Sequence, residues 1–216
     1  MYLYYITDRS QFPGTEADRC AALLSKIGEA ARAGVDFIQL REKDLATRDL
    51  EGLASAAQAQ IRAVHQNEAD AHEPSSLPRT RLLINSRTDV VLAVGADGVH
   101  LRSDDVSAND VRQLIGISAP KRDRFLIARS CHAVREVHAA GTDFVVFAPV
   151  FEKADTCATG LAALREACRA PLPVIALGGV SLDNALSCID AGAAGVAGIR
   201  LFQNNDISAV IRRLRG

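Results

Sequence analysis

One short stretch of the chain carries positive charge in a pattern suited to binding an anion. In FIQLREK, Gln39, Arg41 and Lys43 alternate with apolar residues and with Glu42. Residues two apart share one face of a β-strand, so this face carries an amide, a guanidinium and an ammonium group. Because a buried charge without a partner is costly, the two cations need a counter-charge. We expect them to bind phosphate or pyrophosphate; the alternatives are an internal salt bridge to Glu42 or Asp44, or a helix start exposed to solvent.

Glycines end two later stretches and indicate a second anion site. LPVIALGGVS contains Gly178 and Gly179, and GAAGVAGIRLF contains Gly198 followed by Ile199. Glycine allows backbone N–H groups to approach a phosphate closely. We therefore predict that these residues bind a phosphate group, with Arg200 adding positive charge.

Candidate groups for proton transfer and metal binding lie between these two stretches. LIARSCH places Ser130 and His132 two residues apart, and histidine is suited to moving protons near neutral pH. Asp104 and Asp105 offer carboxylate oxygens to a hard divalent ion; alternatively, they cap a following helix. We interpret His100, just upstream, as a packed and hydrogen-bonded residue.

These candidates lie at the ends of short apolar runs that recur along the whole chain. The runs are rich in β-branched and aromatic residues and cover 3–7, 37–41, 82–86, 98–101, 125–130, 144–150, 174–178 and 195–201. Longer stretches with helical spacing lie between them, such as 50–64, 89–94, 111–117, 133–140, 161–168 and 182–191. Strands that alternate with helices predict parallel β-α units.

Eight such units predict a single (β/α)8 barrel over residues 1–216, because this fold begins near about 200 residues. Glycines that precede four of the strands, Gly34, Gly95, Gly141 and Gly192, are typical of helix ends. A doubly wound open sheet is the alternative, but no GxGxxG motif follows the first strand. In a barrel of this kind, functional groups lie at the carboxyl ends of the strands.

One polar segment interrupts the pattern. Residues 65–81 contain two prolines and few apolar side chains, so we predict an extended surface loop within the single domain. Its two histidines, His65 and His72, are more typical of solvated loop side chains than of a metal site.

Composition limits the class of protein. Of the 216 residues, 25 are Lys or Arg and 26 are Asp or Glu, so the formal net charge is −1. This balance argues against a general nucleic-acid binder, and no apolar run reaches the roughly 18 residues of a membrane span. The five cysteines form no CxxC pair, which argues against a zinc site and favours a reducing, cytoplasmic location. Charge and composition leave open whether the protein forms a homo-oligomer.

Eight segments, in this order, resemble the thiamine phosphate synthase/TenI superfamily: YYITDR, AGVDFIQLREKD, LLINSRTD, GADGVHL, ARSCH, DFVVFAPVFE, PVIALGGV and GAAGVAGI. Each segment is short, but their combination is specific and spans nearly the whole chain. The resemblance implies a (β/α)8 barrel that acts on a small molecule, a thiazole phosphate. Two activities occur in this superfamily.

The first activity is that of the synthases, which use Mg²⁺ to join hydroxymethylpyrimidine pyrophosphate to thiazole phosphate and release pyrophosphate. The resemblance implies that Gln39, Arg41, Lys43 and Asn85 bind the pyrimidine pyrophosphate, and that Asp105 binds Mg²⁺; Ser130 also matches. Two features depart from the synthase pattern. Ser86 stands where the family has a second carboxylate after Asn85, and the GPxxxTxTK loop appears as APVFEKADTCATG, in which Lys153 is a partial substitute.

The second activity is that of the TenI-like tautomerases, which isomerise a thiazole carboxylate phosphate and need no metal. The chain is similar to them in RSxH, which ends at His132, and in VFE, which ends at Glu152. The resemblance implies His132 as general acid and base and Glu152 as a substrate-binding residue. In this interpretation Gly179 and Gly198 hold the phosphate, and Arg41 or Lys43 meets the carboxylate.

Because the second carboxylate and the TxTK loop are missing, the sequence favours the metal-independent tautomerase. The synthase with Mg²⁺ is the alternative. A non-catalytic or regulatory protein that binds a phosphate ligand is the third hypothesis.

Overall fold

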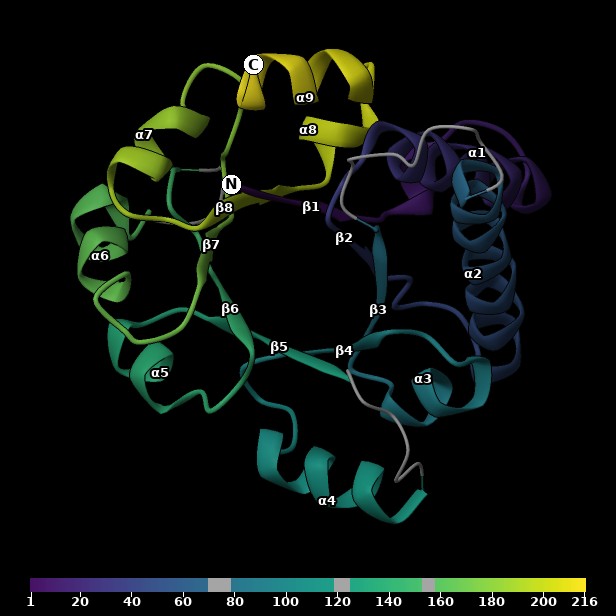
Figure 1. Ribbon diagram of the computed structural model, residues 1–216, viewed down its shortest axis with the longest axis horizontal. Helices are drawn as coiled ribbons and strands as arrows, with labels where there is room; N and C mark the ends of the chain where they lie inside the picture. The colour runs from purple at the N-terminus through teal and green to yellow at the C-terminus, as the bar shows by residue number, and fades with distance from the viewer. Residues whose placement is uncertain (70–78, 119–124, 153–157) are drawn as a thin grey trace.

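Eight parallel strands form a closed barrel at the centre of the molecule (Figure 1). The computed structural model describes residues 1–69, 79–118, 125–152 and 158–216. The strands are β1 (Tyr2–Ile6), β2 (Phe37–Leu40), β3 (Arg81–Asn85), β4 (Gly98–Leu101), β5 (Leu126–Cys131), β6 (Phe144–Phe147), β7 (Val174–Ala176) and β8 (Gly195–Gly198). Each strand pairs with the next, and β8 pairs with β1. The predicted (β/α)8 barrel is therefore confirmed.

Helices surround the barrel and connect its strands (Figure 1). They are η1 (Arg9–Gln11), α1 (Glu16–Ala33), α2 (Thr47–Ala69), α3 (Thr88–Val94), α4 (Ala108–Ser118), α5 (Val134–Ala139), α6 (Gly160–Ala167), α7 (Ala185–Asp190), α8 (Arg200–Gln203) and α9 (Ile207–Arg215). Gly34 and Gly95 end α1 and α3 with positive φ angles of 82° and 73°, as the sequence predicts. Among the described helices, none is long and apolar enough to cross a membrane.

The predicted loop at 65–81 begins later than expected. Helix α2 continues to Ala69, and β3 begins at Arg81, so the first five residues of the predicted loop are helical. The reason is that HQNEA contains good helix formers and that no proline interrupts it. Residues 70–78, with His72, lie outside the described residues.

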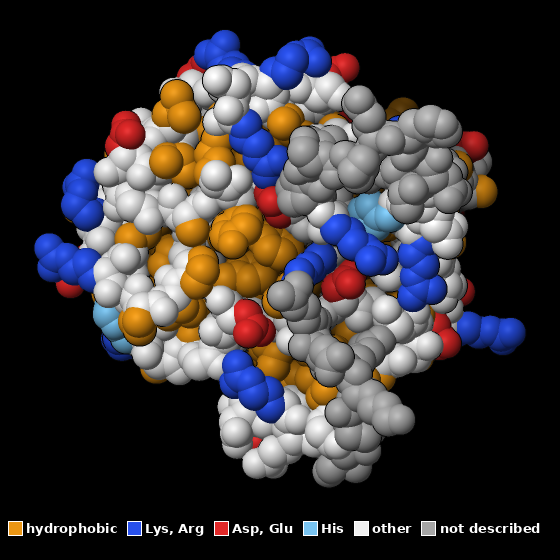
Figure 2. Space-filling model, in the orientation of Figure 1, with side chains coloured by type: hydrophobic (Ala, Val, Ile, Leu, Met, Phe, Trp, Pro, Cys, Tyr) orange, Lys and Arg blue, Asp and Glu red, His pale blue; other side chains and the backbone are white. Residues whose placement is uncertain are grey.

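The strands separate two apolar layers. Ile38 and Leu40 pack outward against the helices, whereas Phe37 points into the barrel. Inside, Phe37 stacks on Phe144 with ring centroids 4.8 Å apart, and Tyr4 meets both rings edge-on. Hydrophobic side chains also cover the centre of the face at which the strands begin (Figure 2). Among the described residues, these side chains fill the interior at the amino ends of the strands, and a ligand would enter at the carboxyl ends.

A buried arginine joins the end of β1 to the segment after β2. The Arg9 guanidinium, whose side chain is 5% exposed, lies 3.1 Å from Glu42 and makes two contacts of 2.7 Å with Asp44. Glu42 is equally buried and also accepts hydrogen bonds from the Thr7 hydroxyl and from the Arg9 backbone. Both carboxylates are thus held by Arg9 and not by Arg41 or Lys43, their neighbours in the sequence after β2.

Replacing Arg9 should destabilise the fold strongly. In Arg9→Met, Glu42 stays buried without its cation, and breaking such a pair from one side costs about 3–5 kcal/mol. Urea unfolding measures this difference in the free energy of unfolding. Arg169→Met, which breaks an exposed pair with Glu166, is the matched control and should cost about 0–1 kcal/mol. Equal losses in the two variants would contradict a structural role for the buried pair.

Candidate functional site

A pocket of about 1010 Å³ opens at the carboxyl ends of the strands. Twelve of the candidate residues from the sequence line it: Gln39, Arg41, Lys43, Asn85, Asp104, Ser130, His132, Gly178, Gly179, Gly198, Ile199 and Arg200. Most of them lie at or just after the ends of β2, β3, β5, β7 and β8. Asp105 is not among the lining residues. Glu152 is exposed and is not among the lining residues. Its contact with substrate stays a prediction, and Lys153 lies outside the described residues.

One side of the pocket is cationic. Within the described residues, neither Arg41 nor Lys43 forms an ion pair, because Arg9 holds both Glu42 and Asp44. The predicted alternative of an internal salt bridge is therefore wrong. The Arg41 guanidinium, burial and Arg102 together lower the pKa of Lys43, which reflects crowding of like charges. Such a cluster favours a bound anion, which would relieve the repulsion.

Another part of the pocket wall consists of glycines at the ends of β7 and β8. Gly178 and Gly179 have φ angles of 96° and 66°, a region that favours glycine. A Cβ on Gly178 would lie 2.6 Å from the Cα of Pro149, and one on Gly179 would lie 2.7 Å from the Cβ of Phe151. Close packing against the segment after β6 therefore requires glycine at both positions, and both residues also line the pocket, where a phosphate site is predicted.

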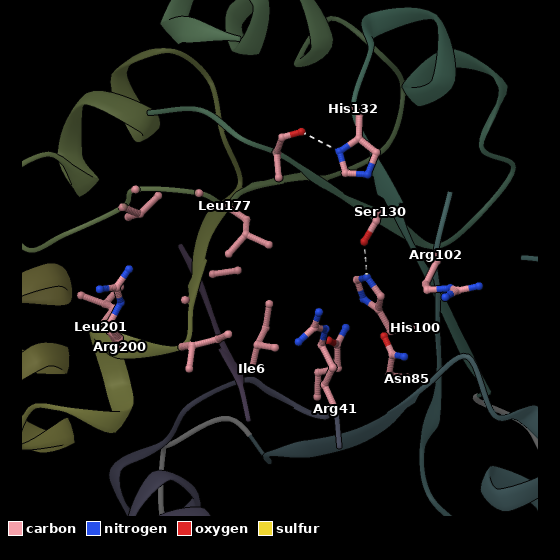
Figure 3. Close-up of a pocket in the computed structure, with 18 of the residues that line it drawn as sticks. Ile6, Arg41, Asn85, His100, Arg102, Ser130, His132, Leu177, Arg200 and Leu201 are labelled. Atoms are coloured by element: carbon pink, nitrogen blue, oxygen red, sulfur yellow. Dashed lines mark hydrogen bonds between the residues drawn. The ribbon is translucent and has the colours of Figure 1, made fainter. Parts of the chain in front are cut away.

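Apolar side chains lie between the two polar sides. Ile6 and Leu177 project into the space between Arg41 and Arg200 (Figure 3). Neither residue is among the candidates that the sequence indicates. Strand alternation was the signal available for Ile6, because Tyr4, two residues earlier, also points inward. This surface suits the flat face of an aromatic ring.

A buried hydrogen-bonded chain reaches the pocket beneath Ser130. The Tyr4 hydroxyl lies 3.0 Å from Nδ1 of His100. Nε2 of His100 lies 2.8 Å from the Ser130 hydroxyl (Figure 3). Gln39 donates to the Tyr4 hydroxyl at 3.4 Å. His100 is thus hydrogen-bonded on both ring nitrogens, as predicted. Burial, and to a lesser degree the charge of Arg41, lowers its pKa to about 3.

His132 presents one ring nitrogen to the pocket. Its Nδ1 lies 2.8 Å from the carbonyl oxygen of Ala148, and its backbone N–H donates to Glu136. A neutral imidazole that donates from Nδ1 carries its lone pair on Nε2. This arrangement suits a proton acceptor at the pocket wall.

The acidic group expected for a metal ion is already hydrogen-bonded. Asp105 accepts from the Ser86 hydroxyl at 2.6 Å and from the Arg102 backbone at 2.7 Å. Burial raises the pKa of Asp105, but these hydrogen bonds outweigh it and the net shift is downward. Asp104 lies 3.1 Å from the Arg102 guanidinium, so Arg102, unlike Arg41, has carboxylate partners.

Asp105 and Ser86 supply only part of the ligand set that Mg²⁺ requires. Within the described residues, no group of three His, Cys, Asp or Glu side chains comes together. Mg²⁺ often takes one or two carboxylates from the protein and its remaining ligands from substrate phosphates and water. Asp105 with the Ser86 hydroxyl fits such an ion only when a phosphorylated substrate completes it.

Fold and pocket together define a (β/α)8 barrel with a partly cationic pocket at the carboxyl ends of its strands. The family model described as thiamine monophosphate synthase matches residues 3–202, and the chain belongs to this family. It is 35% identical to a thiamine-phosphate synthase of Syntrophomonas wolfei, over 99% of this chain and 94% of that protein. It is 38% identical to a putative thiamine-phosphate synthase of Geobacter sulfurreducens, over 90% and 83%.

Solved structures agree with this assignment. A thiamine phosphate pyrophosphorylase from Pyrococcus furiosus superposes with a TM-score of 0.77 at 26% identity, over 99% of this chain and 93% of that one. A 3-hexulose-6-phosphate synthase superposes with a TM-score of 0.61 at 19% identity, which shows the shared fold alone.

The buried His100 should make stability depend on pH. Its pKa is about 3 in the folded protein and near 6.5 when exposed, so between these values the unfolded chain binds more protons. Stability should therefore fall as the pH falls below about 6.5. Urea unfolding at several pH values should show that the free energy of unfolding falls less steeply with decreasing pH in His100→Gln than in the wild type. His138→Gln, at an exposed position, is the control and should match the wild type. An unchanged slope in His100→Gln would contradict the assignment.

Proposed function

We propose that this protein joins hydroxymethylpyrimidine pyrophosphate to thiazole phosphate and releases pyrophosphate. The observation that carries the proposal is one pocket that has both a cationic part, at Arg41 and Lys43, and a glycine-lined part, at Gly178, Gly179 and Gly198. The reaction requires two phosphorylated substrates at once, and each side would receive one of them. The names of the relatives support the same reaction. The proposal therefore reverses the preference for a tautomerase that the sequence alone favours.

The chain's own residues have distinct parts in this reaction. The ring nitrogen of the thiazole forms a bond to the methylene carbon of the pyrimidine, while the bond from that carbon to the pyrophosphate oxygen breaks. The electron pair leaves with pyrophosphate, next to the unpaired cations Arg41 and Lys43. Fixed charges aimed at a developing negative charge stabilise the transition state without reorganising. Ile6 and Leu177 would hold the two rings together between the anion sides and exclude water.

Asp105, with the Ser86 hydroxyl, would hold the Mg²⁺ that the family implies, together with the pyrophosphate oxygens. When bound, the ion neutralises charge on the leaving group. Arg102 would release part of its contact with Asp105, since that guanidinium lies 3.4 Å from the carboxylate.

Removing either Arg41 or Lys43, the cations that follow β2, should selectively weaken binding of the pyrimidine substrate. Charge-assisted hydrogen bonds contribute about 1.5–3 kcal/mol, so Arg41→Gln and Lys43→Gln should each lower kcat/KM for hydroxymethylpyrimidine pyrophosphate roughly 10- to 100-fold. KM for thiazole phosphate should stay close to the wild-type value. Steady-state formation of thiamine phosphate in the presence of Mg²⁺ measures both constants.

Arg62→Gln removes an exposed arginine of α2 and is the control for total charge. Equal effects on the two substrates would contradict the assignment of the cations to the pyrophosphate. Tight binding of thiazole phosphate without any product would favour the non-catalytic hypothesis instead.

A second candidate function is the metal-independent isomerisation of a thiazole carboxylate phosphate. The observation that favours it is His132, whose Nε2 is free to take a proton, combined with Ser86 in place of a second carboxylate. Here the glycine side would bind the phosphate, and Arg41 would bind the carboxylate.

His132→Ala separates the two candidates. If the protein is an isomerase, this variant should lose at least about 100-fold in turnover, within the usual contribution of a general acid or base. If it is a synthase, thiamine phosphate formation should fall far less, because no proton transfer is required of His132. Both assays are run on the wild type and on His132→Ala, with chelator added to test the metal requirement. Isomerase turnover that persists in His132→Ala would exclude the second candidate.

A further inference from the structure

The chain of hydrogen bonds beneath the pocket has a direction. It runs from Gln39 through Tyr4 and His100 to Ser130, and the first three residues are at most 2% exposed. None of these three can exchange its partner for water. Each proton in the chain must therefore be donated to a neighbour within it.

The hydrogen bond from Gln39 to Tyr4 determines in which direction protons are donated along the chain. The Gln39 amide nitrogen has no lone pair to offer, so it donates to the Tyr4 hydroxyl. The single proton of Tyr4 then goes to Nδ1 of His100, which must be unprotonated. A neutral imidazole with a bare Nδ1 carries its proton on Nε2, and this N–H donates to the Ser130 hydroxyl oxygen.

The protonation states that this requires agree with the surroundings. Burial raises the pKa of the Tyr4 hydroxyl far above its ordinary value, so Tyr4 keeps its proton. The His100 ring is buried too and stays neutral at physiological pH. Among the described residues, the Ser130 side chain has no other hydrogen-bond partner, so its own proton is free to point into the pocket.

We propose that Tyr4 and His100 are positioning residues that hold the Ser130 hydroxyl as a hydrogen-bond donor toward an anion bound beside Arg41. Ser130 and Arg41 both line the pocket, and His100 lies between them in the view of the site (Figure 3). With the opposite His100 tautomer, Ser130 would donate its proton to Nε2 and turn a lone pair toward the anion. The proposal rests on the proposed function only in naming pyrophosphate as that anion.

The His100 tautomer is directly measurable. Long-range ¹H–¹⁵N NMR spectra of protein labelled with ¹⁵N-histidine distinguish a ring protonated at Nε2 from one protonated at Nδ1. We expect the Nε2–H tautomer of His100 in the wild type at neutral pH. An Nδ1–H tautomer, or a doubly protonated ring, would overturn the proposal whether or not the protein makes thiamine phosphate.

Pyrophosphate binding tests the consequence for the ligand. Tyr4→Phe keeps the ring but removes the proton that selects the tautomer, so calorimetry with pyrophosphate and Mg²⁺ should show about tenfold weaker binding, a typical loss for a hydrogen bond to a charged group. Tyr5→Phe is the matched control, because its buried hydroxyl donates to Gln203 on the outer side of the barrel. It should bind pyrophosphate as the wild type does.

A double-mutant cycle separates positioning from a general loss of structure. In a Ser130→Ala background, Tyr4→Phe should change pyrophosphate affinity less than twofold, because the hydroxyl that it orients is gone. The same tenfold loss in that background would overturn the proposal. Intact pyrophosphate binding and the Nε2–H tautomer, without thiamine phosphate formation, would refute the proposed function and leave this inference standing.

Discussion

The arrangement of the pocket depends on the ion pairs between Arg9 and the carboxylates of Glu42 and Asp44. These carboxylates adjoin Arg41 and Lys43 in the sequence and would neutralise them if they were free. Arg9 is buried just after β1, in η1, and its ion pairs hold both carboxylates beside the end of β1. Arg41 and Lys43 then lie close to one another, and the repulsion between their charges favours binding of an anion on this side of the pocket.

The barrel converts this local charge into a site with two sides. Aromatic rings around Phe37 and Phe144 fill the interior at the amino ends of the strands. Among the described residues, this leaves the carboxyl ends of the strands for a ligand. There, the segment after β2 contributes the cations Arg41 and Lys43, and the turn after β7 and the end of β8 contribute glycine backbone. Apolar side chains lie between them. This order of cation, apolar surface and glycine turn matches two phosphorylated ring compounds placed end to end.

Sequence alone could predict whatever depends on local spacing. Strand alternation put Gln39, Arg41 and Lys43 on one face, and glycine marked the helix ends and the turns at the pocket. It could not predict that Arg9 pairs with Glu42, because that contact depends on the register in which Ile6 lies opposite Gln39. The chain from Tyr4 to Ser130 joins three strands and carries no local signal. The end of α2 was misplaced because polar helix formers resemble loop residues in composition.

The central claim is that one pocket binds two anions on opposite sides. A crystal structure of the protein with both pyrophosphate and thiazole phosphate tests it most directly. We expect pyrophosphate against Arg41 and Lys43 and, in the same molecule, the thiazole phosphate group at Gly179 and Gly198. Pyrophosphate at the glycines in place of thiazole phosphate, or no anion at Arg41 and Lys43, would rule out a pocket that binds the two substrates together.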